Sequence, residues 1–149
     1  QLHVKKSSAR VFVVISDGEL QEGSSWEALM MAANLKLANL TVLLDHNGMQ
    51  SFGRTVDTHP AFYPIEEKVR AFGFNCGVAD GHNVENIVSV VRETQSACTD
   101  KPSLVLCNTV KAKGVSFMEG VPIWHYRSPT DEEFQLALSE LEEFQYDEK

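Results

Sequence analysis

The sequence lacks any long uninterrupted hydrophobic run. No apolar stretch approaches the roughly 18 residues that a transmembrane helix needs, and residues 1–6 contain no apolar core of a signal peptide. We therefore expect neither a membrane span nor a secretory leader.

Cysteines are few. The 149 residues hold three, Cys76, Cys98 and Cys107, which are widely spaced and form no C-x-x-C pair. An odd number of scattered thiols argues against a disulfide framework and favours a reducing, cytoplasmic compartment. Packing in the core is the role expected of each thiol.

A cluster of positive charge is also missing. The chain has 21 acidic and 13 basic residues, a formal net charge of −8. Eight of the acids and one lysine fall within residues 131–149, so the rest of the chain is close to neutral. We expect no nucleic-acid partner, and we predict an acidic C-terminal helix and tail over residues 131–149.

What the sequence does contain is an alternation of short apolar runs and helical periodicities. Its 43% hydrophobic content is enough for one domain over residues 1–149. Strands are predicted at 10–16, 40–45, 74–79 and 103–109, and helices from Ser25, over 64–72, after Asn83 and after Thr130. This alternation predicts an α/β fold, an open and mainly parallel sheet with helices on both faces.

Several details of these elements can be predicted. The run Arg10–Ser16 is nearly all apolar, as is typical of a strand covered on both faces. The first helix should bury a stripe of five residues, and the last helix a stripe of four. The two stripes are Trp26, Leu29, Met30, Ala33 and Leu37, and Phe134, Ala137, Leu138 and Leu141.

Other signals mark where elements begin and end. Gly73 should end the second helix and Asn83 should cap the third, which would bury Val84, Ile87, Val88 and Val91. Thr130 and Glu133 form a capping-box pattern ahead of the last helix. Residues 46–60 are predicted to form a loop.

Oxygen-bearing side chains follow the first two strands. Asp17 and Gly18 come after the first strand, and Asn47 comes after the second. Because a strand–helix–strand crossover brings the ends of both strands to one edge of a parallel sheet, Asp17 and Asn47 should be neighbours. A carboxylate and an amide oxygen, with phosphate and water, suit Mg²⁺, and Gly18 allows a diphosphate to approach the backbone.

A second interpretation of these residues stays open. Asp-Gly and Asn-Gly are both common turn sequences, so the pattern by itself also fits two turns with no ligand. The chain contains neither G-x-G-x-x-G nor G-x-x-x-x-G-K-[ST], and the usual dinucleotide and P-loop sites therefore have no support.

Two long segments carry a family resemblance. The segment "SDGELQEGSSWEALMMAANLKLANLTVLLDHNGMQ" resembles the thiamine-diphosphate motif of transketolases, which opens Gly-Asp-Gly and closes near Asn. The segment "VKAKGVSFMEGVPIWHYRSPTDEE" is similar to a later transketolase segment with Lys-Gly-Lys-Gly and then Trp-His-Gly. The resemblance extends from about residue 10 to residue 143 and implies a thiamine-diphosphate-binding fold, in part.

The resemblance implies the cofactors and the residues that hold them. Mg²⁺, for which Ca²⁺ or Mn²⁺ could substitute, would be bound by Asp17, Asn47 and the backbone carbonyl of Met49. Gly18 would lie against the diphosphate of thiamine diphosphate, and Lys111 would lie near the cofactor.

The resemblance also implies roles at the edge of the site. His125 matches a histidine between diphosphate and substrate that assists proton transfers, and Arg127 could meet remaining negative charge. Glu22 and Glu27 match an acidic network at a subunit interface, although a solvent-exposed pair on the first helical turns is equally open. The other candidate histidines, His46, His59 and His82, are interpreted as loop residues rather than ligands.

The sequence departs from the family pattern at three places. Ser16 replaces the first glycine of Gly-Asp-Gly, and Ala112 replaces a glycine beside Lys111. Tyr126-Arg127 stands where Gly-Lys is usual, next to the expected substrate entrance. These changes bear on the identity of the substrate more than on cofactor binding.

The implied function is that of one component of a split transketolase, moving a two-carbon ketol unit between sugar phosphates. The family's pyrimidine-binding domain and the earlier part of its diphosphate-binding domain are not recognisable here, so we expect partner chains to supply both. That the sequence is a piece of a larger protein stays open as a second setting. The alternatives are a non-catalytic assembly module or degenerate fragment, and another thiamine-diphosphate enzyme such as a 2-oxoacid dehydrogenase component or deoxyxylulose-phosphate synthase.

Overall fold

A parallel four-stranded sheet forms the centre of the computed structural model, which describes residues 8–51, 53–97 and 100–147. The strands are β1 (Val11–Ser16), β2 (Leu40–His46), β5 (Asn75–Asp80) and β6 (Ser103–Asn108), in the order β1-β2-β6-β5. The register pairs Ser16 with Asp45, and both His46 and Asp80 with Asn108, so all four strands end at one edge.

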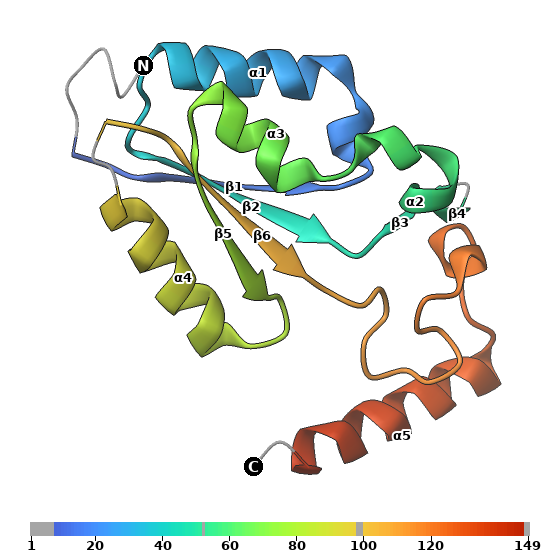
Figure 1. Ribbon diagram of the computed structural model, residues 1–149. Coiled ribbons are helices and arrows are strands. Elements are labelled where there is room, and N and C mark those ends of the chain that lie inside the picture. The colour runs from blue at the N-terminus through green and yellow to red at the C-terminus, as the bar shows by residue number, and fades with distance from the viewer. Residues whose placement is uncertain (1–7, 52, 98–99, 148–149) are drawn as a thin grey trace.

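Helices cover the sheet from two sides. Helices α1 (Gly23–Asn34) and α3 (Ile65–Phe72) lie over one face, and α4 (Val84–Ala97) lies over the other (Figure 1). Two separate cores follow from the alternation of side chains along each strand. Leu44 and Leu104 pack beneath α1 and α3, whereas Val105 packs beneath α4. The predicted α/β fold with helices on both faces is confirmed.

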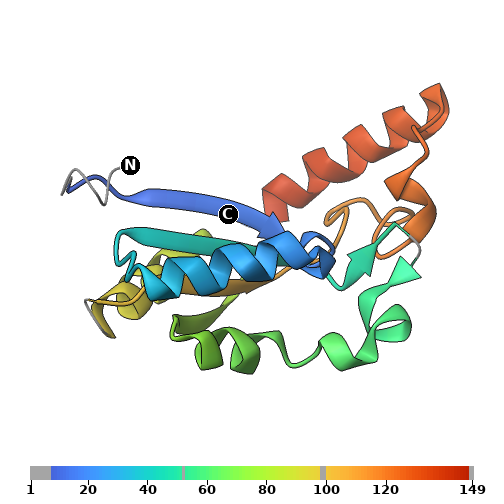
Figure 2. The same cartoon turned by 90° about the horizontal axis from the view of Figure 1, so that it is seen from above.

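The remaining elements are short, apart from the last helix. They are the 3₁₀ turns η1 (Glu19–Gln21), η2 (Pro60–Phe62) and η3 (Pro122–His125), the strands β3 (Met49–Gln50) and β4 (Gly53–Arg54), and the helix α2 (Thr55–Thr58). The last helix, α5 (Asp131–Asp147), extends beyond the carboxyl edge of the sheet (Figure 2). None of the described helices combines the length and apolar character needed to cross a membrane.

Three predicted boundary signals are confirmed. Gly73 ends α3 with a φ of 105°, which a glycine adopts without strain. The Asn83 side chain accepts a hydrogen bond from the backbone N–H of Asn86, 2.9 Å away. Thr130 and Glu133 exchange the two bonds of a capping box, at 2.8 and 3.3 Å.

The prediction that the first strand is covered on both faces is wrong. Strand β1 lies at the edge of the sheet, and Phe12 and Val14 on it are 53% and 69% exposed. The physical reason is that α4 packs mainly on β5 and β6, on the opposite side of the sheet from β1. A continuous apolar run cannot by itself distinguish a central strand from an edge strand.

The predicted helical stripes are only partly correct. In α1, Met30 is 42% exposed while Ala32 is buried, and the helix ends before Leu37. In α4, Ile87 and Val91 pack against the sheet while Val84 and Val88 are exposed. In α5, Ala137 alone of the predicted stripe is buried, and Phe134, Leu138 and Leu141 are exposed. Each exposed stripe faces a side on which the described residues provide no packing partner.

The remaining corrections concern the loop and the cysteines. Residues 46–60 are not a plain loop, because they contain β3, β4 and α2. Cys76 and Cys107 are free and buried, as core packing predicts, and burial raises the pKa of Cys76 to about 11. Cys98 and the end of the acidic tail lie outside the described residues.

Candidate functional site

The two strand ends that carry Asp17 and Asn47 are adjacent. The backbone N–H of Asp17 donates to the carbonyl oxygen of Asp45 at 3.1 Å, which continues the β1–β2 pairing past the end of β1. The chain then turns into η1 after β1 and into the β3–β4 hairpin after β2. The carboxyl edge of the sheet therefore brings Asp17 next to residues 47–49, as the crossover geometry predicts.

Asp17 is completely buried, with 0% of its surface exposed. Its Oδ1 accepts a hydrogen bond from the backbone N–H of Gly18 at 2.8 Å, and its Oδ2 accepts one from Gly48 at 2.7 Å. Burial raises the pKa of the Asp17 carboxyl above its ordinary value of 3.8, an effect that the Gly48 bond and the nearby His46 oppose. The carboxylate is thus held rigidly at a place where a cation would stabilise its charge.

The side chain of Asn47 shapes the loop after β2. Asn47 Oδ1 accepts a hydrogen bond from the backbone N–H of Met49 at 2.8 Å, while Nδ2 donates to Asp45 at 3.2 Å. Gly48 has a φ of 69°, in the left-handed region that favours glycine. This turn presents the Gly48 N–H to Asp17, so the loop and the carboxylate fix each other.

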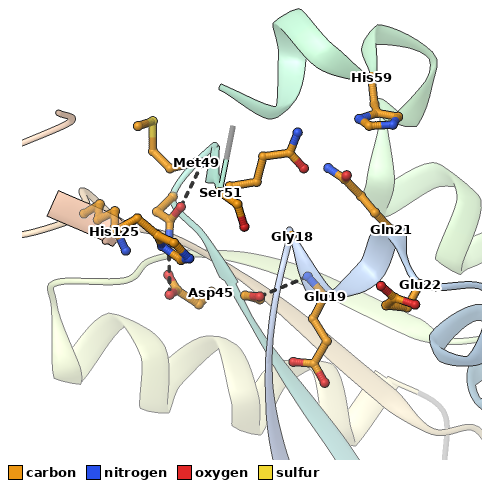
Figure 3. Close-up of a pocket in the computed structure, with 13 residues that line it drawn as sticks. Gly18, Glu19, Gln21, Glu22, Asp45, Met49, Ser51, His59 and His125 are labelled. Atoms are coloured by element: carbon orange, nitrogen blue, oxygen red, sulfur yellow. Dashed lines mark hydrogen bonds between the residues drawn. The ribbon is translucent and has the colours of Figure 1, made fainter. Parts of the chain in front are cut away.

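A cavity of about 500 Å³ opens beside this junction (Figure 3). Its lining contains most of the residues predicted for the site, and it adds several that were not predicted. The lining residues are Ser16, Gly18, Glu19, Gln21, Glu22, Asp45, Asn47, Met49, Gln50, Ser51, His59, Lys111 and His125. Asp17 is buried next to Gly18 and does not itself line the cavity, and neither does Glu27.

Gly18 leaves space on the cavity side. Its φ of −62° is open to any residue, and an added Cβ would lie 3.6 Å from Gln50 Cβ and 3.9 Å from the Met49 carbonyl oxygen. Those are ordinary van der Waals distances, so the fold itself does not require glycine here. A side chain at this position would instead occupy the space between Gly18 and the Met49 carbonyl.

The sequence is similar to known transketolases over nearly its whole length. Residues 3–141 match the family described as transketolase, thiamine diphosphate binding domain. The chain belongs to this transketolase family. The structure agrees, because a transketolase crystal structure from Campylobacter jejuni superposes with a TM-score of 0.70 over 95% of this chain and 26% of that chain. At 20% identity, that superposition shows the shared fold.

Curated relatives are more similar in sequence. The 6-deoxy-6-sulfo-D-fructose transketolase subunit SqwG of a Clostridium species is 42% identical over 89% of this chain and 47% of its own length. An apulose-4-phosphate transketolase subunit from Actinobacillus succinogenes is 39% identical over 92% of this chain and 49% of its own length. The chain therefore spans about half the length of these relatives.

Two departures from the transketolase pattern have a visible structural effect. Ser16 Oγ accepts a hydrogen bond from the backbone N–H of Glu19 at 3.0 Å, so it shapes the turn into η1. Ala112 stands where the family pattern has glycine and has a φ of 61°. This left-handed conformation strains an alanine and explains why a glycine is usual there.

Other pocket residues were not predicted to be there. His59, interpreted as a plain loop residue, reaches the cavity wall, as does Gln21 (Figure 3). Gln50 also lines the cavity. Gln21 Nε2 is buried and has no hydrogen-bond partner among the described residues. Gln21 and Gln50 reach the cavity because they closely follow Gly18 and Met49 in the sequence, whereas the place of His59 at the cavity follows from no sequence spacing.

The remaining histidines and acids lie as follows. His46 Nδ1 is 2.9 Å from Asn108 Oδ1, and His82 Nε2 accepts the backbone N–H of Val110 at 2.7 Å. Glu22 and Glu27 are both exposed on this chain, Glu22 at the cavity. Their exposure leaves them accessible to another polypeptide.

Proposed function

We propose that this chain supplies the diphosphate-binding side of a Mg²⁺–thiamine diphosphate site in a multi-subunit transketolase. The observation that carries the proposal is the 2.7 Å bond from the Gly48 N–H to the buried Asp17 carboxylate, because it holds the candidate metal ligands of two loops together. A metal-binding role gives a reason for burying a charge at this position.

The residues present fit a hard divalent cation. Asp17, Asn47 and the Met49 carbonyl offer only oxygen ligands, as Mg²⁺ prefers. Within the described residues no group of three or more His, Cys, Asp or Glu side chains could hold a metal by itself. A sparse set completed by diphosphate oxygens and water is the arrangement expected of Mg²⁺ with a phosphorylated cofactor.

Each remaining site residue has a proposed task. Gly18 leaves room for the diphosphate, and Lys111 at the cavity lining balances negative charge. His125 lines the same cavity and would hold or move a proton at a substrate hydroxyl. Thiamine diphosphate itself, when bound, supplies the carbanion chemistry of ketol transfer.

The proposed complex contains at least one more kind of chain. A pyrimidine-binding chain would complete the cofactor site, and the exposed Glu22 and Glu27 would lie at that interface. The uncovered strand β1, with Phe12 and Val14 exposed, supports a further polypeptide that packs on this edge, such as the earlier part of the diphosphate-binding domain.

We also propose the substrate class and compartment. The relatives named above are named for a sulfonated sugar and for a sugar phosphate, so we propose an anionic ketose as the donor. The buried free thiols of Cys76 and Cys107 support a reducing, cytoplasmic compartment.

The proposal is tested by calorimetry on the assembled enzyme. Thiamine diphosphate should bind with Mg²⁺ and fail to bind in EDTA. Gly18→Ala should weaken this binding at least about tenfold, roughly 1.4 kcal/mol, because its methyl group enters the cavity without disturbing the fold. Gly23→Ala is the matched control, because a methyl group there meets nothing within 4 Å.

Two outcomes would contradict the proposal. One is equal cofactor affinity with Mg²⁺ and in EDTA, and the other is unchanged affinity in Gly18→Ala. Turnover then separates the alternatives. Ketol transfer from fructose 6-phosphate, apulose 4-phosphate or 6-deoxy-6-sulfo-D-fructose supports a transketolase, 2-oxoacid decarboxylation supports the other enzyme class, and binding without turnover supports an assembly module.

A further inference from the structure

The segment that carries Lys111 and His125 has little regular structure. Between β6 and α5 it contains one 3₁₀ turn, η3, and His125 is the last residue of that turn. Both Lys111 and His125 line the cavity. The position of His125 therefore depends on contacts within this segment and with its neighbours rather than on strand pairing in the sheet.

One set of contacts connects residues within this segment and connects the segment to α5. Trp124 Nε1 donates to the Phe117 carbonyl at 3.1 Å, and the two rings pack edge to face at 5.5 Å. The Arg127 guanidinium lies over the Trp124 ring, 4.1 Å from its centroid, and pairs with Glu133. These contacts hold the segment together but do not connect it to the other wall of the cavity.

Tyr126 makes that connection. Its hydroxyl donates a 2.6 Å hydrogen bond to the backbone carbonyl of Ser51, which follows β3. Ser51 also lines the cavity, and it directly follows the hairpin residues Met49 and Gln50. The bond thus spans from the loop beside His125 to the loop that carries the candidate metal ligands.

We propose that Tyr126 is a positioning residue, which fixes His125 at the cavity by fastening η3 to the β3–β4 hairpin. The inference rests on the proposed function and deepens it. Tyr126 is 63% exposed, so burial contributes little, and its side chain reaches the hairpin through the hydroxyl bond. The ring also packs edge to face on His125, with centroids 5.1 Å apart.

The geometry places Tyr126 outside the cavity lining. Tyr126 does not line the cavity, whereas His125 and Ser51 do. Loss of the Tyr126 hydroxyl should therefore change how often His125 is correctly placed and leave cofactor affinity alone. A net hydrogen bond of ordinary strength changes such an equilibrium by about three- to tenfold.

The kinetic test uses Tyr126→Phe in the assembled enzyme, with 6-deoxy-6-sulfo-D-fructose, apulose 4-phosphate and fructose 6-phosphate as donors. We expect kcat to fall about three- to tenfold, while the Kd of thiamine diphosphate with Mg²⁺ changes less than twofold. In an His125→Ala background, Tyr126→Phe should have no further effect on kcat, because Tyr126 acts through His125. An unchanged kcat, or equal effects in both backgrounds, would overturn the proposal.

A second test requires no turnover. Hydrogen exchange of the amides in residues 117–127 should be at least about threefold faster in Tyr126→Phe than in the wild type. Tyr63→Phe is the matched control, because its hydroxyl bonds to Thr55 instead and its loss should leave residues 117–127 unchanged. Unchanged hydrogen exchange in Tyr126→Phe would refute the positioning role of Tyr126, even if the enzyme is active. Failure of the assembled enzyme to bind the cofactor would refute the proposed function, even if hydrogen exchange becomes faster.

Discussion

Replacing Asp17 by asparagine should change how stability depends on pH. The wild-type carboxyl is buried and its pKa is raised above 3.8, so the folded chain binds that proton more tightly than the unfolded chain. The contribution of Asp17 to the free energy of unfolding is therefore fully present below the pKa of the unfolded chain. It is lost as the pH rises through the higher pKa of the folded chain. Asp17→Asn has no proton to lose and should lack this decline.

The structure also indicates how much stability Asp17→Asn should lose. Both Asp17 oxygens accept backbone N–H groups, from Gly18 and Gly48. An asparagine keeps one acceptor and turns an NH₂ toward the other N–H, which costs about 1–3 kcal/mol. The wild type should be more stable than Asp17→Asn by about that amount near pH 4, and the difference should shrink toward pH 8.

Urea denaturation of both proteins between pH 4 and pH 8 measures this difference. If the two backbone bonds governed the titration of Asp17 instead of burial, its pKa would be lowered and the difference would grow with rising pH. A growing or constant difference would therefore refute the argument. In the assembled enzyme, Mg²⁺ with thiamine diphosphate at 100 times its Kd should stabilise the wild type by about 2.7 kcal/mol and should not stabilise Asp17→Asn.

Two further predictions concern glycine positions. A Cβ on Gly81 would lie 2.3 Å from Thr109 Cγ2 and 2.8 Å from the Asn108 carbonyl oxygen, so Gly81→Ala should cost about 1–3 kcal/mol. Differential scanning calorimetry should show a Tm at least about 2 °C lower, and a Tm equal to that of Gly23→Ala would contradict the steric argument. Ala112→Gly should relieve the left-handed strain and stabilise the chain by about 0.5–1 kcal/mol in urea denaturation, whereas a loss of stability would show that the conformation is not strained.

The sequence predicted the parts of the site that depend on local order along the chain. Apolar runs and helical periods indicated the alternation of strands and helices, and that alternation places successive strand ends at one edge. Asp17 and Asn47 therefore had to be close. The family motifs added Lys111 and His125, and both reach the same cavity.

Tertiary contacts decided the rest. The presence of His59 at the cavity, and the bond from Tyr126 to Ser51, depend on contacts between segments that are far apart in the sequence. The exposure of β1 was likewise decided by where α4 packs. An amino-acid pattern specifies which face of an element is apolar, but only the packed structure determines which neighbour meets that face, because packing depends on the whole arrangement of elements.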